Sequence, residues 1–268
     1  MNNRTRFRHA RPPEWPNEAS IDLDSWPPAP NQLQLIKGDK ATVSGFVRLS
    51  GTPPMYFKRF RPTLPCGLLA RRALGQDQAL HNWTLARRLR MRGIHVARPY
   101  AVIWGPSESW YLCEAFQGST TLQETARLYA ERKKELTRLT QEAIEQLAQL
   151  HAMGVSHGDF KWGNLLVVRS GIVVTDLDST RQHRSTSTRL AAEDLGRFLV
   201  CGLEAGLGQS WAHLCVRRYA DLRQQPAEII ETPLRSSIMR ISRAHQQRYR
   251  RAAVSLAPWR VDHREEST

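Results

Sequence analysis

The sequence predicts an α+β protein with two lobes, a small β-rich N-terminal lobe and a mainly helical C-terminal lobe. A chain of 268 residues, of which 41% are apolar, is long enough to bury a sizeable core. Its first part reads mainly as short strands separated by turn residues, and its second part repeats apolar residues at helical spacing. We therefore expect a Pro-rich N-terminal extension at 1–30, the β-rich lobe at 31–117 and the helical lobe at 118–268.

The extension at 1–30 contains many prolines and few periodic apolar residues, so we expect it to be irregular. The β-rich lobe should begin with two strands within 32–51, joined by a turn from Gly38 to Lys40. A short aromatic strand, MYFKRF, is expected next, at 55–60.

A helix is expected from Gln78 to Arg92, because its apolar residues recur at helical spacing among many arginines. Gly93 is well suited to end this helix. Two further strands, within 96–104 and 109–116, should follow and be joined by the turn GPSE.

The C-terminal lobe should consist mainly of helices. Thr121 and Glu124 have the spacing of a capping box, which predicts a helix start. The expected longer helices lie within 135–154, 189–206, 210–225 and 233–252, and the last of these is strongly basic. Between the first two, residues 157–178 read as loop, strand, turn and strand.

Charge is the unusual bulk property of this chain. Lys and Arg number 39 against 25 Asp and Glu, which gives a formal net charge of +14. The expected partners are anionic: nucleic acid, phospholipid head groups or a phosphorylated glycolipid; a merely solvated basic surface is the alternative. One basic region comprises Arg71, Arg72, Arg87, Arg88, Arg90 and Arg92, and a second comprises Arg235, Arg240, Arg243, Arg248, Arg250 and Arg251.

Targeting and cysteine patterns favour a cytoplasmic protein. The longest apolar runs are too short to span a membrane, and the basic N-terminus has no apolar segment of the kind found in signal peptides. The four cysteines are scattered without CxxC spacing, which argues against a zinc site or a disulfide framework.

The stretch HGDFKWGNLLVVRSGIVVTDLD, at 157–178, concentrates polar groups beside apolar runs. Taken singly, Asp159 and Asn164 are as compatible with turns as with chemistry, and Asp176 resembles an ordinary strand-end aspartate. Lys58, in the aromatic strand, is by itself more typical of a surface lysine. Their order along the chain is harder to obtain by chance.

This order of motifs resembles that of protein-kinase-like enzymes. HGDFKWGN is similar to their catalytic loop, H-x-D-x-K-x-x-N; VVTDLD stands where they carry a second metal-binding Asp; and MYFKRF looks like their third strand. HGD, DLD and AEDLGRFL look most like the bacterial lipopolysaccharide core kinase family, whose members phosphorylate Kdo or heptose sugars. The resemblance covers roughly residues 33–220 and implies a bilobal protein-kinase-like fold that uses ATP and Mg²⁺.

Phosphoryl transfer needs positioning, metal and positive charge more than covalent help. The resemblance implies that Asp159 accepts or orients the proton of the sugar hydroxyl and that Lys161 offsets charge on the transferring phosphate. Asn164 and Asp176 would supply the hard oxygen ligands that suit Mg²⁺. His157 is expected to be structural rather than a base.

The nucleotide is expected to contact the β-rich lobe. Lys58 would hold its α- and β-phosphates, and backbone groups around Glu114 and Phe116 would meet the adenine edge, although an ordinary strand-edge charge explains Glu114 equally well. Backbone amides from Gly38 to Thr42 could approach phosphates. Asn82 stands where the family usually has a Glu that pairs with the lysine, a departure that bears on ATP positioning.

Two further aspartates flank the metal position. Asp178 replaces the usual glycine and could bind metal, orient a basic residue or cap a turn. Asp194 is expected to brace the catalytic loop through backbone amides, with a plain helix-start aspartate as the alternative. The segment after Asp176 is too short for a protein-kinase activation segment, which favours a sugar or other small-molecule acceptor.

These observations favour an ATP-dependent sugar kinase acting on lipopolysaccharide core, with an expected peripheral contact to the anionic inner membrane. One alternative is a kinase-fold phosphotransferase acting on a protein or another small molecule. Another is a non-catalytic kinase-fold protein that binds an anionic envelope glycolipid. A nucleic-acid partner is not expected, because aromatic residues are not interleaved with the basic ones.

Overall fold

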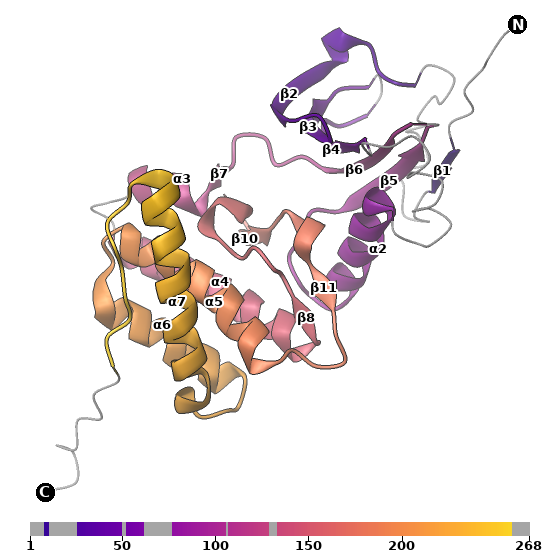
Figure 1. Ribbon diagram of the computed structural model, residues 1–268. Helices are drawn as coiled ribbons and strands as arrows, with labels where there is room; N and C mark the ends of the chain where they lie inside the picture. The colour runs from indigo at the N-terminus through magenta and orange to yellow at the C-terminus, as the bar shows by residue number, and fades with distance from the viewer. Residues whose placement is uncertain are drawn as a thin grey trace, which may run out of the picture. The chain divides into compact units, whose positions relative to one another are not determined.

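The computed structural model describes residues 8–10, 26–49, 52–61, 77–105, 107–128 and 133–258. The chain forms two compact units, unit 1 at 1–118 and unit 2 at 119–268 (Figure 1). Unit 1 contains the main sheet, and unit 2 contains most of the helices.

Unit 1 is built on a six-stranded antiparallel sheet with the strand order β1-β5-β6-β4-β3-β2. Its strands are β1 (Arg8–Ala10), β2 (Leu33–Gly38), β3 (Thr42–Val47), β4 (Met55–Phe60), β5 (Pro99–Trp104) and β6 (Ser109–Glu114). A short 3₁₀ helix, η1 (Pro30–Gln32), precedes β2. The five strands predicted after residue 31 are confirmed, including the turn between β2 and β3.

The prediction that residues 1–30 are irregular is wrong at residues 8–10; residues 1–7 and 11–25 lie outside the described part of the chain. Arg8–Ala10 forms β1, which pairs antiparallel with β5 and covers an edge that would otherwise be open. Trp26 is buried in the core of the sheet, where its ring meets that of Trp110 edge-to-face at 5.1 Å. Local composition could not reveal either contact, because both depend on residues more than 80 positions away.

Helix α2 (Gln78–Met91) packs against β5 and β6. The Asp77 side chain caps its start by accepting a hydrogen bond from the Leu80 amide at 2.9 Å. Gly93 follows its end with a φ of +81°, a conformation that favours glycine, so the predicted helix and its terminator are confirmed.

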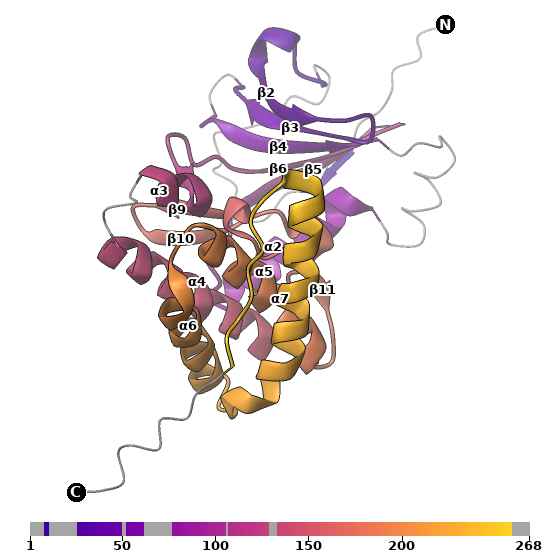
Figure 2. The ribbon, with the colours of Figure 1, turned by 60° about the vertical axis from the view of Figure 1, so that its left-hand side comes forward.

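Unit 2 contains α3 (Leu122–Leu128), α4 (Lys133–Ala152), α5 (Thr188–Glu204), α6 (Gly208–Leu222) and α7 (Ala227–Tyr249). Its short strands are β7 (Thr120–Thr121), β8 (Val155–Ser156), β9 (Leu165–Val168), β10 (Gly171–Val174) and β11 (Arg181–Gln182). They form one sheet in the order β10-β9-β7 and a two-stranded pair of β11 with β8. Figure 2 shows α7 lying along α5, the closest helix pairing in the unit.

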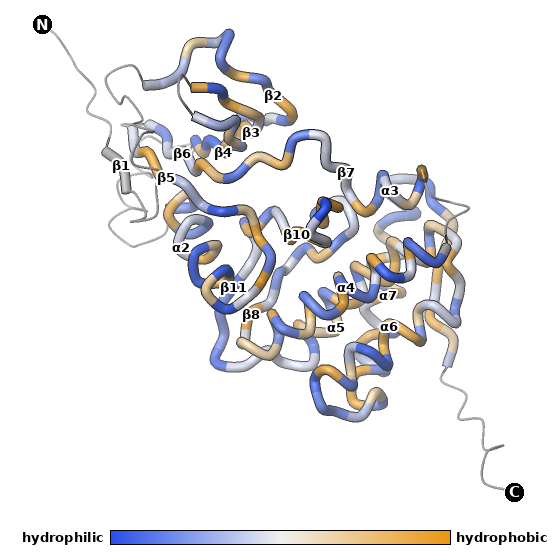
Figure 3. Tube along the Cα trace, turned by 180° about the vertical axis from the view of Figure 1, so that it is seen from behind, coloured by the Kyte–Doolittle hydropathy of each residue, from blue (hydrophilic) through white to orange (hydrophobic). Residues whose placement is uncertain are grey.

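Amphipathic patterning explains why these helices cluster. Apolar and polar residues alternate along α4 and α6 (Figure 3), so each helix can bury one face and expose the other. The predicted capping box is confirmed, because the Thr121 amide donates to the Glu124 carboxylate at 2.8 Å and the Glu124 amide donates to the Thr121 hydroxyl at 3.1 Å.

The predicted start of the last helix is wrong by six residues. Helix α7 begins at Ala227, and Pro233 lies inside it rather than at its start. Proline removes one helical hydrogen bond, but buried residues on both sides of it, Ile230 and Leu234, anchor the helix against the rest of the unit. Tertiary packing therefore outweighs the preference of proline for the first turn of a helix over its interior.

An aromatic cluster connects the 157–164 loop to the helices of unit 2. The rings of Phe160 and Trp162 each lie 5.9 Å from that of Phe198 on α5, and Trp162 is 5.9 Å from Trp211 on α6. All four side chains are buried. Packing thus fixes Phe160 and Trp162, and the polar residues that alternate with them, Asp159 and Lys161, take defined positions.

The buried position of Trp26 predicts that the N-terminal segment stabilises unit 1. We expect Trp26→Ala to lower the free energy of unfolding by about 3 kcal/mol, because it removes a large buried ring. Leu35→Ala is the matched control, since Leu35 is 64% exposed and its loss should change stability by less than about 0.5 kcal/mol. Urea denaturation measures both, and equal effects of the two changes would contradict the assignment.

Candidate active site

The loop after β8 carries most of the residues singled out in the sequence. Its second residue, Gly158, has a φ of +79°, and a Cβ placed there would lie 2.7 Å from the carbonyl oxygen of Ser179. Glycine is therefore required on both conformational and steric grounds. This explains the glycine in HGD from the structure of the loop itself.

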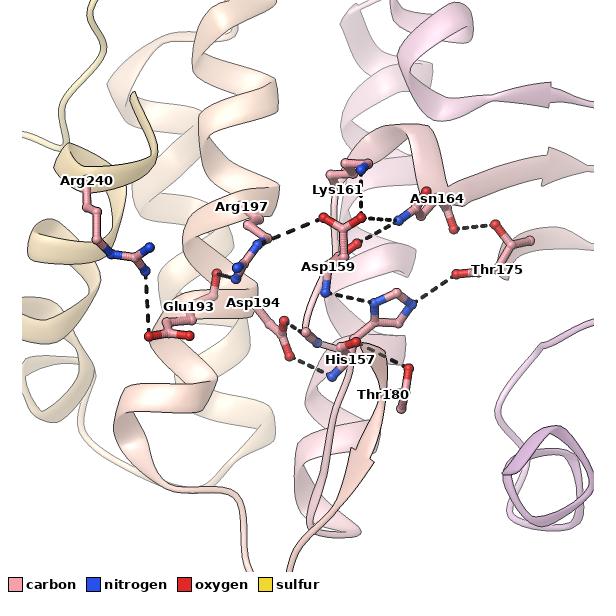
Figure 4. A network of polar contacts seen from close by, with 11 residues as sticks. His157, Asp159, Lys161, Asn164, Thr175, Thr180, Glu193, Asp194, Arg197 and Arg240 are labelled. Carbon is pink, nitrogen blue, oxygen red and sulfur yellow. Dashed lines mark hydrogen bonds and ion pairs between the residues drawn. The ribbon is translucent and has the colours of Figure 1, made fainter. Parts of the chain in front are cut away.

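Asp194, on α5, braces this loop as predicted. One carboxylate oxygen accepts a hydrogen bond from the backbone amide of His157 at 2.7 Å, and the other accepts one from the amide of Gly158 at 2.8 Å (Figure 4). The carboxylate is almost fully buried. Two charge-assisted hydrogen bonds to consecutive amides fix the direction in which the loop leaves β8.

A second layer of contacts orients Asp194. His151 Nε2 lies 3.3 Å from the Asp194 carboxylate, and His151 Nδ1 lies 2.7 Å from the hydroxyl of Tyr219 on α6. Burial lowers the pKa of His151, so the ring is neutral at pH 7. Because a carboxylate only accepts, Nε2 carries the proton and Nδ1 accepts from Tyr219.

These contacts also set the ionisation of Asp194. Burial alone would raise the pKa of its carboxyl group, but the hydrogen bonds from His151 and from the backbone amide of His157 outweigh that effect. The net result is a pKa below the usual value. Asp194 is thus an anion at neutral pH and can accept both loop amides.

His157 is structural, as expected. It is fully buried, and its Nε2 lies 3.0 Å from the carbonyl oxygen of Thr175, which can only accept a hydrogen bond. The proton is therefore on Nε2, and Nδ1 accepts from the amide of Asp159 at 3.3 Å. Burial lowers the pKa of His157, which keeps the ring neutral. The imidazole links the loop to the end of β10.

Asp159 lies at the centre of the polar group. Its Oδ2 accepts hydrogen bonds from Lys161 Nζ at 2.6 Å and from Asn164 Nδ2 at 3.0 Å. Its Oδ1 faces Nε of Arg197, on α5, at 4.0 Å. The side chains of Asp159 and Lys161 are partly exposed, so the carboxylate is accessible from solvent.

The arrangement of Asn164 leaves its amide oxygen directed away from Asp159. Its amide nitrogen donates two hydrogen bonds, one to the backbone carbonyl of Asp159 at 2.9 Å and one to the Asp159 carboxylate. Its own backbone carbonyl accepts from the amide and the hydroxyl of Thr175, each at 2.9 Å. These bonds tie Asn164 to the residue that precedes Asp176.

Asp176 adopts an unusual backbone conformation. Its φ of 60° and ψ of 64° fall in the left-handed region, which costs a non-glycine residue roughly 1 kcal/mol. It precedes the 3₁₀ helix η3 (Leu177–Ser179), yet its side chain makes no capping hydrogen bond there. Asp176 therefore differs in backbone conformation from the ordinary strand-end aspartate that was the alternative. For Asp178, the backbone carbonyl accepts from Arg181 at 3.0 Å, and its side chain keeps no assigned role.

The donor set of these residues fits Mg²⁺ better than a transition metal. Asn164 and Asp176 offer an amide oxygen and a carboxylate, and Mg²⁺ is typically held by one or two carboxylates together with substrate phosphates. In the part of the chain that the structure describes, no three His, Cys, Asp or Glu side chains are grouped to hold a metal by themselves. Such a site would need oxygen atoms from a nucleotide.

The remaining predicted site residues lie in unit 1. Lys58 is in β4, in register with Ser44 and Tyr111. Glu114 ends β6, and its carboxylate accepts the backbone amide of Arg98 at 3.1 Å. Phe116 follows two residues later, and Gly38 ends β2.

Asn82 is buried on α2 and accepts a hydrogen bond from the side chain of Gln78 at 3.3 Å. An amide at this position cannot form the ion pair that a glutamate would.

The expectation that amides from Gly38 to Thr42 approach phosphates needs correction. The Asp39 carboxylate already accepts hydrogen bonds from the amides of Ala41 and Thr42, at 2.8 and 2.7 Å. These two donors are therefore occupied within the turn. The Asp39 charge also makes the turn less favourable for another anion.

The second basic region is partly neutralised. Arg71 and Arg72 lie outside the described residues. Arg251 pairs with Glu204, and Arg240 lies 3.6 Å from Glu193. The second basic region therefore contains both paired and exposed arginines.

Two contributors to the site escaped sequence reasoning. Tyr219 reaches His151 from a helix 68 residues away, and no local pattern signals that contact. Arg197 could have been found, because it stands three positions after Asp194 on the same helix and so on the same face.

Comparisons with known proteins identify the family and the fold. A family model described as "Lipopolysaccharide kinase (Kdo/WaaP) family" matches residues 53–215. A solved structure described as "WaaP in complex with acyl carrier protein" is similar with a TM-score of 0.58 and 18% identity, over 82% of this chain and 90% of that one. No curated protein matches the sequence. The predicted family resemblance and the bilobal kinase-like α+β fold are confirmed.

The hydroxyl of Tyr219 is expected to stabilise the braced loop. Tyr219→Phe should lower the free energy of unfolding by about 1–2 kcal/mol, because it leaves the buried Nδ1 of His151 without its donor. Tyr249→Phe is the matched control, since Tyr249 is exposed and should change stability by less than about 0.5 kcal/mol. Chemical denaturation measures both changes. If the two variants are equally stable, Tyr219 does not orient His151.

The buried neutral histidines predict a pH dependence of stability. Below a pH of about 6.5, His151 and His157 become protonated in the unfolded chain but not in the folded one, because burial lowers their folded pKa values. Their contribution is complete above that pH and is lost as the pH falls. We expect the free energy of unfolding to drop between pH 7 and 5.5, approaching about 1.4 kcal/mol per pH unit for each histidine.

Two measurements check this dependence. Urea denaturation gives the stability at each pH, and NMR of the imidazole carbons reports whether the rings titrate in the folded protein. Stability that is unchanged over this range, or imidazoles that titrate near pH 6.5 in the folded state, would contradict the predicted neutral pair.

Proposed function

This chain belongs to the lipopolysaccharide kinase (Kdo/WaaP) family, and on that premise we propose that it is an ATP- and Mg²⁺-dependent kinase for a sugar hydroxyl, on Kdo or heptose, of lipid A–core. Family membership supports phosphotransferase activity. The observation that carries the proposal is the group of Asp159, Lys161 and Asn164 on a loop braced by Asp194. The proposed location is cytoplasmic.

Asp159 is the proposed acceptor of the hydroxyl proton. Its Oδ2 is held by Lys161 and Asn164, whereas Oδ1 faces Nε of Arg197 at 4.0 Å, a distance too long for a hydrogen bond. An acceptor hydroxyl could therefore donate to Oδ1 without displacing the contacts that orient the carboxylate. A positioned base of this kind typically contributes 10²- to 10⁴-fold to the rate, by rough estimate.

Lys161 is the proposed cation for the transferring phosphate. It pairs with Asp159 at 2.6 Å, and about half of its side chain is exposed, so it can reach an anion that arrives beside the carboxylate. Asn164 and Asp176 are the proposed ligands of Mg²⁺, which would neutralise charge on the phosphates of bound ATP. The strained backbone of Asp176 supports a functional rather than a capping role.

Unit 1 is proposed to hold the nucleotide. Lys58 would contact its α- and β-phosphates, and Glu114 and Phe116 would border the adenine. These roles follow the family arrangement. Because Asn82 stands in place of an acidic residue, we propose that the side chain of Lys58 is oriented less firmly than in relatives whose glutamate forms an ion pair with the lysine.

An anionic glycolipid is the proposed partner, with peripheral contact to the inner face of an anionic membrane. The formal charge of +14 and the exposed arginines of α7, such as Arg235 and Arg243, support this choice. Among the described helices, none is long and apolar enough to cross a membrane.

Replacement of the proposed base tests the function directly. With labelled ATP, Mg²⁺ and purified lipid A–core, Asp159→Asn should reduce phosphate transfer about 10³-fold, because the amide keeps the shape but cannot accept the proton. The matched control is Glu135→Gln, which removes an exposed carboxylate on α4 and should leave transfer unchanged. Undiminished transfer by Asp159→Asn would reject the assigned base.

The competing functions give different outcomes in companion measurements. Stabilisation by ATP and Mg²⁺ in a thermal shift, with no transfer to lipid A–core, would indicate a kinase-fold enzyme with a protein or another small molecule as acceptor. Binding of lipid A–core without any stabilisation by ATP would indicate the non-catalytic alternative.

A further inference from the structure

Arg197 stands beside the proposed base without forming a closed ion pair with it. Its Nε lies 4.0 Å from Oδ1 of Asp159, beyond hydrogen-bonding distance, and its side chain is 25% exposed. The guanidinium is held in place from the other side, because its Nη1 donates to the backbone carbonyl of Glu193 at 3.1 Å. Arg197 is therefore oriented toward the reacting region and retains unused donors.

Basic side chains outnumber carboxylates among the ion pairs that Asp159 and Glu193 form with Lys and Arg. Glu193, on α5, is shared by Arg189 at 3.4 Å and by Arg240, from α7, at 3.6 Å. Figure 4 shows the contact with Arg240. With Lys161 on the other side of Asp159, four cations face two carboxylates. The carboxylate of Glu193 is thus occupied by other arginines and does not neutralise Arg197.

We infer that Arg197 is a specificity-determining residue, which binds an anionic group, a carboxylate or a phosphate, that the acceptor carries next to the hydroxyl to be phosphorylated. The inference rests on the proposed function. A hydroxyl that donates to Oδ1 of Asp159 brings the neighbouring substituents of the same sugar within reach of the guanidinium. Arginine suits both anions because its planar donors bind their oxygens in pairs.

A different role for Arg197 makes a different prediction. If Arg197 only positioned the carboxylate of Asp159, its loss would impair every acceptor equally. If it binds an anion on the acceptor, its loss impairs only acceptors that carry that anion.

The test compares Arg197→Gln with the wild type on three acceptors. These are intact lipid A–core, lipid A–core with its carboxylates amidated by ethanolamine, and lipid A–core dephosphorylated with hydrofluoric acid. On the intact acceptor, kcat/KM should fall about 100-fold, as expected for the loss of a charge-assisted pair. On the acceptor that lacks the recognised anion, the loss in kcat/KM should shrink to roughly threefold. A smaller loss on the amidated acceptor identifies a carboxylate, and a smaller loss on the dephosphorylated acceptor identifies a phosphate.

Two further variants control the comparison. Arg197→Lys keeps the charge but not the paired donors and should recover part of the activity on the intact acceptor. Arg189→Gln removes a more exposed arginine of the same helix, which contacts the same Glu193, and should leave all three acceptors unaffected. Circular dichroism and thermal melting establish that each variant is folded.

Binding measured without ATP separates this inference from the proposed function. Wild-type protein should bind intact lipid A–core about 100-fold more tightly than Arg197→Gln does, whether or not transfer follows. Binding without transfer would reject the kinase proposal and leave the role of Arg197 intact. Equal binding by the two proteins, no binding by the wild type, or an equal loss of kcat/KM on all three acceptors would overturn the inference.

Discussion

Two hydrogen bonds from the backbone amides of His157 and Gly158 to one buried carboxylate, that of Asp194, determine where the candidate catalytic groups lie. Removing a carboxylate from water costs several kcal/mol unless its oxygens are well satisfied. Here the two amides and the neutral imidazole of His151 satisfy them. The brace is therefore a fully paired buried charge rather than an isolated one.

The rest of the site follows from that brace and from the packing around it. Gly158 can adopt its conformation against Ser179 only because it lacks a side chain. Phe160 and Trp162 are buried among aromatic residues, so the polar residues that alternate with them, Asp159 and Lys161, emerge on the accessible side. Rigid packing and a buried anion thus position the solvent-facing carboxylate that we propose as the base, and the proposed phosphoryl transfer depends on such positioning.

Much of this could be predicted from the sequence, because the relevant signals are local. The strands of unit 1, helix α2 with Gly93 and the capping box at Thr121 each depend on residues a few positions apart. The bracing role of Asp194 was predictable from the motif around it. Features set by distant pairing were not: the burial of Trp26 against Trp110 and the contact of Tyr219 with His151 have no local signature.

Phosphate transfer by the wild-type protein is the central claim, and ³¹P NMR of lipid A–core incubated with ATP and Mg²⁺ tests it most directly. The proposed function predicts a new phosphomonoester signal on a core sugar and an equal amount of ADP. ATP that stays intact, or that yields only inorganic phosphate while the core sugars remain unmodified, would contradict the account.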